Sequence, residues 1–435
     1  MKVLIIGAGG REHAIVWKIL QSKNVEKVYC APGNAGISKI ACLAGRQATC
    51  VDIKADDIFA LKQFVIREKI DFTIVGPEVP LVRGIVNEFQ KDNLKIFGPT
   101  KEAAILEGSK VFTKEFLKRH NIPTANFKAF DNYIQAVDYL KSKNFPQVIK
   151  VDGLAAGKGV VVASSLKEAE DFLNLIFNNK IFGESGSQVI IEDCLEGEEA
   201  SILVISDGKN FIPLASSQDH KRIFDKDEGP NTGGMGAYSP APVVTDELFK
   251  QILEKIVRPT IDGMQKENRK FSGILYVGVM LTKEGPKVLE YNVRFGDPET
   301  QAILPRLNTD LLEVMQASSD GNLQKFGKEF SWDARHCLCV VAVSGGYPGK
   351  FEKGKEITGL DRIKEIDAAV FHAGTKLDLS GKIVTDGGRV LSVCSLGETL
   401  KIAQEKAYTS IKKIKFEDMH YRTDIGWRAL GKIYN

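Results

Sequence analysis

Residues 148–159, VIKVDGLAAGKG, decide the fold of this chain. An apolar strand ends at Lys150, and a glycine-rich loop that carries Gly157 and Lys158 follows at once. A single lysine is most often a solvated surface charge. Lysines beside free backbone amides are what a triphosphate requires, because its charge must be offset as the terminal phosphoryl group leaves. We therefore expect a nucleotide site here, covered by a mobile flap that carries Lys158.

Two more stretches favour a nucleotide. Residues 190–199, IIEDCLEGEE, predict a strand that runs out into an acidic bend. Its exposed backbone edge could hydrogen-bond an adenine base, and Glu199 could accept hydrogen bonds from ribose hydroxyls. A charged surface turn is an equally good explanation of that stretch alone. A third lysine, Lys110, lies on a predicted helix that also carries Lys114.

A candidate metal site lies in residues 288–292, VLEYN. On a strand, alternate side chains share a face, so Glu290 and Asn292 point the same way and Tyr291 points to the other side. Two hard oxygen donors on one face are typical of a magnesium ion that also binds ATP phosphates. Residues 294–299, RFGDPE, follow at once and add a cation and two carboxylates beside the proposed metal.

The length and the spacing of apolar runs predict several domains. At about 150 residues per domain, 435 residues suggest three. Short apolar runs at residues 3–6, 27–30, 72–75 and 95–97 alternate with helical patterns at residues 12–20 and 58–68. This alternation predicts a parallel, Rossmann-like sheet with crossover helices. We expect mixed α/β and α+β domains: an N-terminal substrate-binding domain at residues 1–101, a nucleotide-binding core at 102–325 with a mobile subdomain at 122–191, and a β-rich domain at 326–435.

The first loop resembles a dinucleotide fingerprint. Gly7, Gly9 and Gly10 follow the first predicted strand, and their amides at a helix start could hold a phosphate. A nicotinamide site usually places an acidic residue after the second strand, but this strand ends in Ala-Pro-Gly at residues 31–33. We favour a sugar phosphate, with close packing of the strand and the helix as the alternative.

The composition excludes few functions but points away from some. Lys and Arg outnumber Asp and Glu by only 59 to 56, so no nucleic-acid or membrane partner is indicated. The first apolar run is too short for a secretion signal, and no later stretch reaches membrane-spanning length. Seven cysteines without a CxxC pair predict reduced thiols. We expect a cytoplasmic monomer that acts on small molecules.

Several stretches together resemble a known family. The combination of lysines on a subdomain, an acidic hinge and an E-x-N metal strand resembles the ATP-grasp superfamily. Residues 7–14 (GAGGREHA), 218–240 (QDHKRIFDKDEGPNTGGMGAYSP) and 292–300 (NVRFGDPET) resemble the phosphoribosylamine–glycine ligase family in particular. The similarity runs in order along the whole chain and includes PGNAG at residues 32–36 and GPE at residues 76–78.

The resemblance implies an activity and a set of residues. The activity would be the ATP-dependent ligation of glycine to 5-phosphoribosylamine through glycyl phosphate, giving glycinamide ribonucleotide, ADP and phosphate in purine biosynthesis. The cofactor would be Mg²⁺, or Mn²⁺, held by Glu290 and Asn292. The other roles implied are binding of ATP by Lys110, Lys150, Gly157, Lys158, Glu192, Leu195 and Glu199; catalysis by Asp219, Lys221 and Arg294; and binding of the other substrates by Gly9, Asn34, Glu78, Asn231, Thr232, Gly233 and Asp297.

Some questions stay open at this stage. The strand at residues 276–281 lacks the carboxylate that many ATP-grasp ligases carry there, so the number of metal ions is undecided. We expect a structural or orienting role for His220 and a packing role for His13. The alternatives for the whole chain are a dehydrogenase, an ATP-grasp ligase for another purine intermediate, and a nucleotide-binding scaffold without catalysis.

Overall fold

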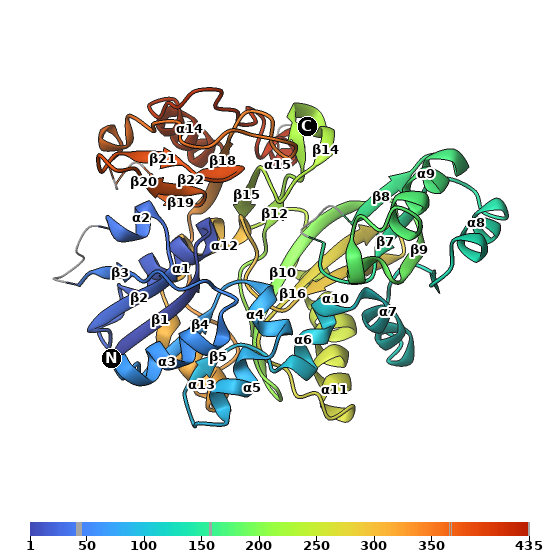
Figure 1. Ribbon diagram of the computed structural model, residues 1–435, viewed down its shortest axis with the longest axis horizontal. Coiled ribbons are helices and arrows are strands. Elements are labelled where there is room, and N and C mark those ends of the chain that lie inside the picture. The colour runs from blue at the N-terminus through green and yellow to red at the C-terminus, as the bar shows by residue number, and fades with distance from the viewer. Residues whose placement is uncertain (41–45, 156–158, 365, 367, 434–435) are drawn as a thin grey trace.

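The computed structural model describes residues 1–40, 46–155, 159–364, 366 and 368–433. A parallel five-stranded sheet forms the N-terminal part, in the order β3-β2-β1-β4-β5 (Figure 1). Its strands are β1 (Lys2–Gly7), β2 (Lys27–Pro32), β3 (Ala48–Cys50), β4 (Phe72–Val75) and β5 (Ile96–Phe97), with helices α1 (Gly10–Ile19), α2 (Ala35–Ser38), α3 (Ile58–Glu68), α4 (Glu78–Val82) and α5 (Ile85–Gln90). The predicted Rossmann-like sheet is confirmed. Because its strands are parallel, the loops after β1, β2 and β4 meet at one edge.

The centre of the molecule is an antiparallel sheet in the order β11-β10-β16-β17. Its long strands β10 (Glu198–Asp207) and β16 (Ser272–Thr282) pair along their whole length, and β17 (Gly285–Asn292) and β11 (Phe211–Pro213) flank them. Nearby helices are α6 (Lys101–Gly108), α7 (Lys110–Arg119), α10 (Asp246–Ile252), α11 (Arg258–Lys266), α12 (Glu299–Ile303) and α13 (Leu311–Ser319); a π-helical turn, Leu253–Val257, joins α10 to α11.

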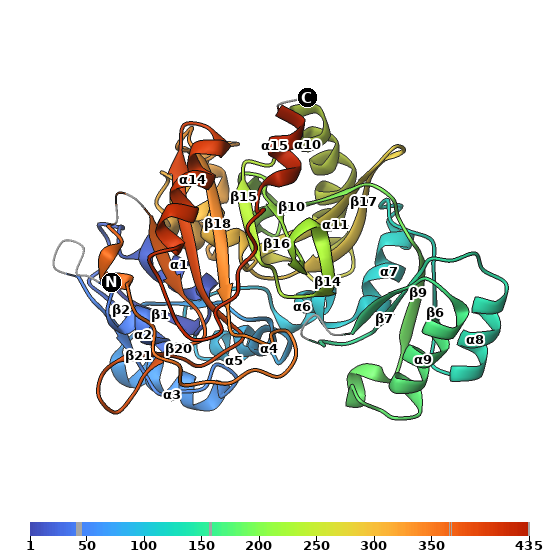
Figure 2. The same cartoon turned by 90° about the horizontal axis from the view of Figure 1, so that it is seen from above.

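A small subdomain projects from this centre (Figures 1 and 2). It contains the sheet β6-β9-β7-β8, formed by β6 (Phe127–Phe130), β9 (Val189–Asp193), β7 (Gln147–Val151) and β8 (Val160–Ala163), and the helices α8 (Tyr133–Lys141) and α9 (Leu166–Phe177). Its apolar core, which includes Leu140, Ile149 and Leu173, is separate from the two larger cores. A unit with its own core can keep its shape while its position changes. We call this unit the lid subdomain.

The C-terminal sheet has the order β12-β15-β18-β22-β19. It combines β18 (His336–Val343), β22 (Arg389–Gly397) and β19 (Ala369–His372) with two earlier strands, β12 (Gln218–Asp219) and β15 (Gly236–Ser239). Thus strands from the middle of the chain extend the predicted β-rich sheet. The remaining elements are β13 (Arg222–Phe224), β14 (Glu228–Asn231), β20 (Thr375–Leu377), β21 (Ile383–Thr385), α14 (Leu400–Ile411) and α15 (Trp427–Ile433).

The predicted helix that carries Lys110 and Lys114 begins at Lys110, after a break from the preceding helix α6. The chain breaks at Ser109 between α6 and α7, where φ and ψ are −142° and 115°. The Ser109 hydroxyl accepts a hydrogen bond from the amide of Phe112 at 3.0 Å and donates to the Asp152 carboxylate at 2.9 Å. Serine favours such a break because its side chain caps the first turn of the new helix. Lys110 and Lys114 therefore both lie on α7, whose start is tied to Asp152 of the lid subdomain.

Two sequence-based expectations bear on the cysteines and the membrane. The six cysteines in the described ranges are free thiols, and four of them, Cys30, Cys337, Cys339 and Cys394, are buried. Cys42 lies outside the described residues. In the part of the chain that the structure describes, no helix combines the length and apolar character needed to cross a bilayer.

Candidate active site

Lys110 and Lys150 lie where the lid subdomain meets the central sheet. Lys110, at the start of α7, donates from Nζ to the carbonyl oxygen of Gly153 at 3.0 Å. Lys150, on β7 of the lid subdomain, donates to the carbonyl oxygen of Leu289 on β17 at 3.2 Å. Each ammonium group thus links the two parts. Burial lowers the pKa of Lys110, and the nearby Glu290 carboxylate opposes that shift.

The side chain of Glu192 lies between two lysines. Its carboxylate lies 3.0 Å from Nζ of Lys150 and 2.9 Å from Nζ of Lys114, and the residue is only 2% exposed. Burial alone would raise the pKa of Glu192, but the two ammonium groups hold it below its ordinary value. The pKa of Lys114 falls to about 8, mainly through burial. Glu192 therefore orients Lys150, and its side chain is enclosed within the protein.

Of the other residues predicted to bind ATP, Leu195 and Glu199 lie in the described part of the chain. Leu195 is half-buried in the bend between β9 and β10, and Glu199 follows near the start of β10. Gly197 in the same bend has φ of 154°, and a Cβ there would lie 2.2 Å from the carbonyl oxygen of Leu281. Only glycine fits this approach. Gly157 and Lys158 lie outside the described residues.

Glu290 and Asn292 share one face of β17. The register of β17 on β16 shifts here, since Gly278 pairs with Glu290 and Val279 pairs with Val288. Such a bulge re-aims the side chains that follow it. The Nδ2 of Asn292 lies 3.5 Å from Oε1 of Glu290, while Tyr291 points into the core. The predicted division of faces is confirmed.

These oxygens suit a metal ion. In the described residues, no group of three or more His, Cys, Asp or Glu side chains forms a metal site by itself. One carboxylate and one amide oxygen match instead an ion that takes its other ligands from phosphates and water. Burial opposes the charge on Glu290, but its pKa is lowered by four cations, namely Lys221, Lys150, Lys110 and Arg294. The same cations could receive a triphosphate.

Lys221 lies among three carboxylates. Its Nζ lies 2.5 Å from Oε2 of Glu199. Removal from water disfavours the charge of Lys221, but Glu199, Asp219 and Glu290 outweigh this effect and raise its pKa well above the ordinary value. Asp219 is 8% exposed, and burial raises the pKa of its carboxyl to about 7 despite the opposing charge of Lys221. A carboxyl poised near neutral pH can exchange a proton during turnover.

The loop that begins at Thr232 connects Lys221 to the C-terminal sheet. Thr232 donates from its amide and its hydroxyl to the carbonyl oxygen of Lys221, both at 2.7 Å. Arg389 of β22 donates from Nη1 to the carbonyl oxygens of Gly233 at 2.8 Å and Asp297 at 2.7 Å. The same nitrogen lies 3.3 Å from Oδ1 of Asp297. The C-terminal sheet thus completes the site.

At the N-terminal sheet, a carboxylate occupies the glycine loop. The Gly9 amide donates to Oε2 of Glu12 at 2.6 Å, and Arg11 donates from Nε to Oε1 of Glu12, also at 2.6 Å. A Cβ on Gly76 would lie 2.1 Å from Oε1 of Glu12. The side chain of Glu12 therefore fills the space between the loops after β1 and β4. In this conformation the Gly9 amide is engaged by a carboxylate.

The Asn34 side chain is also engaged within the protein. Its Nδ2 donates to the carbonyl oxygens of Ala8 and His372, both at 2.8 Å. Its Oδ1 accepts from the amides of Gly36 and Ile37, both at 3.0 Å, and so caps α2. Asn34 thereby joins two N-terminal loops to the C-terminal sheet. A substrate contact by this amide would require these bonds to change.

Arg294 connects the metal strand to the N-terminal sheet. Its Nη2 lies 3.0 Å from Oδ1 of Asn292 and 2.9 Å from Oε1 of Glu107. Its Nε lies 3.3 Å from Oε2 of Glu78, at the start of α4. Burial opposes the charge of Glu78, yet Arg294 and Arg11 lower its pKa. Arg294 therefore connects the predicted metal ligand Asn292 to the predicted substrate residue Glu78 in one network of hydrogen bonds and ion pairs.

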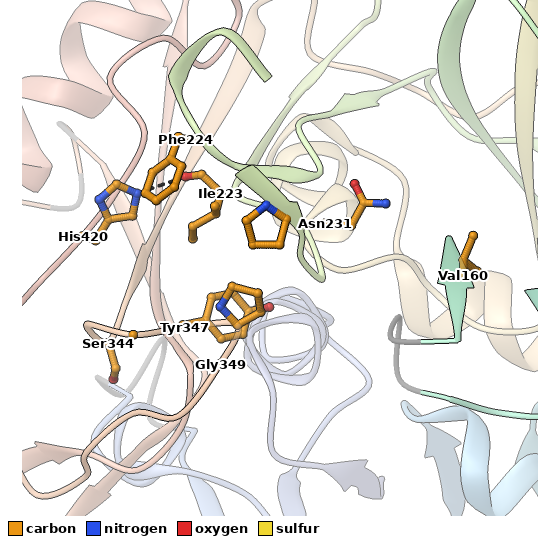
Figure 3. Close-up of a pocket in the computed structure, with 11 residues that line it drawn as sticks. Val160, Ile223, Phe224, Asn231, Ser344, Tyr347, Gly349 and His420 are labelled. Atoms are coloured by element: carbon orange, nitrogen blue, oxygen red, sulfur yellow. Dashed lines mark hydrogen bonds between the residues drawn. The ribbon is translucent and has the colours of Figure 1, made fainter. Parts of the chain in front are cut away.

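A cavity of about 670 Å³ opens beside Asn231, between the lid subdomain and the C-terminal sheet (Figure 3). Asn231, at the end of β14, and Tyr347 line it, and Val160 of β8 stands at the side of the lid subdomain. The hydroxyl of Tyr347 accepts from the Gly233 amide at 3.0 Å. Asn231 therefore lies in an open space next to the Thr232 loop.

Neither histidine of interest is placed to act as a base. His220 is completely buried, and burial lowers its pKa to about 3. Its Nε2 accepts from the Gly426 amide at 3.3 Å, which orients the ring. His13 is buried against Phe371, and its Nδ1 accepts from the His372 amide at 2.8 Å. Both observations agree with structural roles.

Comparison with known proteins identifies the family. Three family models match in order: the N domain of phosphoribosylglycinamide synthetase at residues 1–107, its ATP-grasp (A) domain at residues 108–300 and its C domain at residues 337–428. The chain belongs to the phosphoribosylglycinamide synthetase family. Among curated relatives, the phosphoribosylamine–glycine ligase of Caldanaerobacter subterraneus subsp. tengcongensis is 52% identical over 425 residues, which is 98% of this chain and 99% of that protein. That of Escherichia coli K12 is 51% identical over 436 residues and all of both chains.

Solved structures share the overall fold of this chain. A phosphoribosylamine–glycine ligase from Thermotoga maritima matches with a TM-score of 0.82 and 35% identity, over 98% of this chain and 100% of that one. A biotin carboxylase from Campylobacter jejuni matches with a TM-score of 0.74 at 15% identity, over 98% of each chain. The second match shows only the shared architecture. The ATP-grasp fold inferred from the sequence is confirmed.

Three charged residues that the sequence did not indicate hold the predicted site residues in place. They are Glu107, which holds Arg294; Arg389, which bonds Gly233 and Asp297; and Arg428, which donates to the carbonyl oxygen of Asp219 at 3.4 Å. None of them stands in a loop with an evident ligand pattern. Glu107 gave one signal, because it is a carboxylate directly after the apolar run AAIL at residues 103–106.

Proposed function

We propose that this chain joins glycine to 5-phosphoribosylamine at the expense of ATP, giving glycinamide ribonucleotide, ADP and phosphate in purine biosynthesis. The observation that supports this most is that the charges of Lys221, Lys150 and Lys110 together hold the pKa of the partly buried Glu290 carboxyl below its ordinary value. The positive ammonium groups of these lysines can neutralise the negative charge of the ATP phosphates. The family relatives carry the name of this reaction.

The first half-reaction would activate glycine. A carboxylate is a poor electrophile, so one glycine carboxylate oxygen would attack the γ-phosphorus of ATP and ADP would leave. Lys110 and Lys150 would hold the phosphates, and Lys221 would offset the charge that builds on the transferring group. Glu290 and Asn292 would hold a divalent metal, which supplies further charge neutralisation when bound. Glu192 would keep Lys150 in place through its ion pair.

The second half-reaction would form the amide. The amine of phosphoribosylamine would attack the glycyl carbonyl carbon, the bond from that carbon to the phosphate oxygen would break, and phosphate would leave. The attacking nitrogen must lose a proton. Asp219, whose carboxyl has a pKa of about 7, would accept it. Glu78 and Asp297 would lie on the side of the ribosylamine, together with the loops of Gly9 and Asn34.

The remaining assignments belong to the same proposal. Asn231, Thr232 and Gly233 would border the glycine, and Leu195, Glu199, Gly157 and Lys158 would contact the nucleotide. The lid subdomain, within residues 122–191, would close over the acyl phosphate and keep water out. We propose magnesium as the metal, with manganese as a substitute. The domains would run over residues 1–101, 102–325 and 326–435.

We further propose that the protein works as a monomer in the cytoplasm. The free thiols of the described cysteines suit a reducing compartment. Measurement of mass in solution at micromolar concentration tests the monomer.

An isotope experiment tests the acyl phosphate route. Glycine labelled with ¹⁸O in its carboxylate is converted with ATP and freshly generated phosphoribosylamine. Because the phosphate leaves with a glycine oxygen, each phosphate should carry one ¹⁸O atom. Unlabelled phosphate, with glycinamide ribonucleotide still formed, would contradict the route.

A further inference from the structure

Glu107 is a buried carboxylate without a role in the chemistry above. It is the next-to-last residue of α6 and is 8% exposed. Burial of a carboxylate is costly unless partners compensate. The pKa of Glu107 is raised to about 7 by burial, although Arg294 opposes the shift. The contacts that Glu107 makes therefore indicate why a carboxylate is buried at this position.

The Glu107 carboxylate holds two consecutive residues. Oε2 accepts from the amide of Val293 at 2.8 Å, and Oε1 lies 2.9 Å from Nη2 of Arg294. These residues directly follow Asn292, the second proposed metal ligand. One carboxylate thus fixes both the backbone and the side chain at the end of the metal strand.

Arg294 in turn faces two substrate regions. The nitrogen that contacts Glu107 also donates to Oδ1 of Asn292 at 3.0 Å, and Nε lies 3.3 Å from Glu78. A guanidinium group is planar and presents its donors in fixed directions. When Glu107 fixes one edge, the group has only one orientation that serves Asn292 and Glu78 together. Without Glu107, the group could turn toward Glu78, the other carboxylate that it contacts.

We propose that Glu107 is a positioning residue that keeps Arg294 between the metal ligand Asn292 and the sugar-side residue Glu78. The inference rests on the proposed function, because that function assigns the two sides. The proposal means that the Glu107–Arg294 ion pair couples the nucleotide side of the site to the sugar side. Loss of Glu107 should therefore disturb catalysis and sugar binding at once, while glycine binding is spared.

The test uses Glu107→Gln in the full-length protein. Its matched control is Glu102→Gln on the same helix, since Glu102 is exposed and accepts from Nδ2 of Asn87 at 2.9 Å. For each protein, kcat, the KM of phosphoribosylamine, the KM of glycine and the melting temperature are measured. A misplacement of about 1 Å can cost about 100-fold in rate. We expect kcat of Glu107→Gln to fall about 10–100-fold and the sugar KM to rise, with the glycine KM unchanged.

A double variant separates positioning from general damage. Arg294→Lys should lower kcat by itself, and adding Glu107→Gln should lower it little further, because both changes remove the same arrangement. Additive losses would overturn the proposal, as would wild-type kcat in Glu107→Gln. If that variant does not fold, Glu107→Asp serves, since it keeps the charge but shortens the side chain. Wild-type kcat and sugar KM in Glu107→Asp would also overturn it.

The outcome is distinct from failure of the proposed function. In that case the wild-type protein itself would form no glycinamide ribonucleotide. Here the wild type turns over, and only the comparison among Glu107, Glu102 and Arg294 variants decides.

Discussion

Nζ of Lys221 lies 2.5 Å from Oε2 of Glu199, which joins the loop before β13 to the start of β10. Sequence reasoning placed these residues in different roles, Glu199 on the ribose and Lys221 in catalysis. Their contact means that both roles meet at one point. A nucleotide bound to Glu199 would bring its phosphates toward the cluster that contains Lys221, Lys150 and Lys110.

Lys221→Met should therefore abolish most turnover. The variant keeps the length of the side chain but removes the charge, and loss of one transition-state donor typically costs about 100–1,000-fold in kcat. Steady-state ADP formation is the measurement. The control is Lys250→Met on α10, which removes an exposed ion pair with Glu254 and should leave kcat unchanged. Equal kcat in both variants would remove Lys221 from the mechanism.

Glu290→Ala should abolish turnover by removing a metal ligand. The fold should persist, because Glu290 is half-buried at the cleft and the apolar face of β17 is unchanged. Activity is followed at rising magnesium concentration, and circular dichroism reports the fold. The control is Glu284→Ala. Glu284 lies in the turn before β17, and its exposed side chain pairs with Lys287. Full activity in Glu290→Ala would show that the metal is held elsewhere.

The pH dependence should report Asp219. Its carboxyl has a pKa of about 7, so the proton-accepting form is lost as pH falls through that value. We expect kcat to fall below pH 7 in the wild type. Asp219→Asn should have a low kcat that does not fall further below pH 7, so this acidic limb of the pH profile should be missing. The limb is traced between pH 5.5 and 8.5 at saturating magnesium and substrates, and its survival in Asp219→Asn would assign it to another group.

The Asp219 carboxyl should make the folded protein less stable as pH rises, which is the opposite of what a carboxyl with a lowered pKa does. The folded pKa of Asp219 is raised above the ordinary value of 3.8, so between pH 4 and 7 the folded state binds more protons than the unfolded state. This carboxyl therefore lowers stability as pH rises through that range. The melting temperature of Asp219→Asn relative to wild type should accordingly increase from pH 5 to pH 8. A constant difference would contradict the shifted pKa.

Arg422→Met should destabilise the protein strongly. Arg422 is completely buried, and its guanidinium lies 2.8 Å from both Asp227 and Asp424. Removal of one partner of a buried ion pair leaves uncompensated charge and costs about 3–5 kcal/mol. Chemical denaturation measures the loss. Arg258→Met, which removes an exposed pair with Asp262, is the control and should cost less than about 1 kcal/mol.

Much of the fold follows from local patterns. The alternation of apolar runs and helices predicted the N-terminal parallel sheet, and alternation on residues 288–292 placed Glu290 and Asn292 on one face. Both depend on short-range periodicity, which a sequence displays directly. The break at Ser109 could not be predicted from the sequence, because a serine inside a helical pattern is also compatible with a continuous helix. Its partner, Asp152, lies 43 residues away in sequence.

The site was less predictable than the fold. Long motifs supplied most of its residues through family resemblance, but not their partners. Arg389 meets Gly233 from 156 residues away, and Glu107 meets Val293 from 186 residues away. Such contacts arise from tertiary packing, which no local pattern encodes. The same limit applies to Asn34 and Glu192, whose side chains are engaged inside the protein rather than pointing freely into the cleft.

The central claim is tested most directly by ADP formation. Purified protein with ATP and magnesium is given glycine and freshly generated phosphoribosylamine, and each is then omitted in turn. We predict rapid ADP formation only when both are present, with glycinamide ribonucleotide detected by mass in equal amount. Absence of ADP formation from a folded sample, or ADP formation without glycinamide ribonucleotide, would contradict the account.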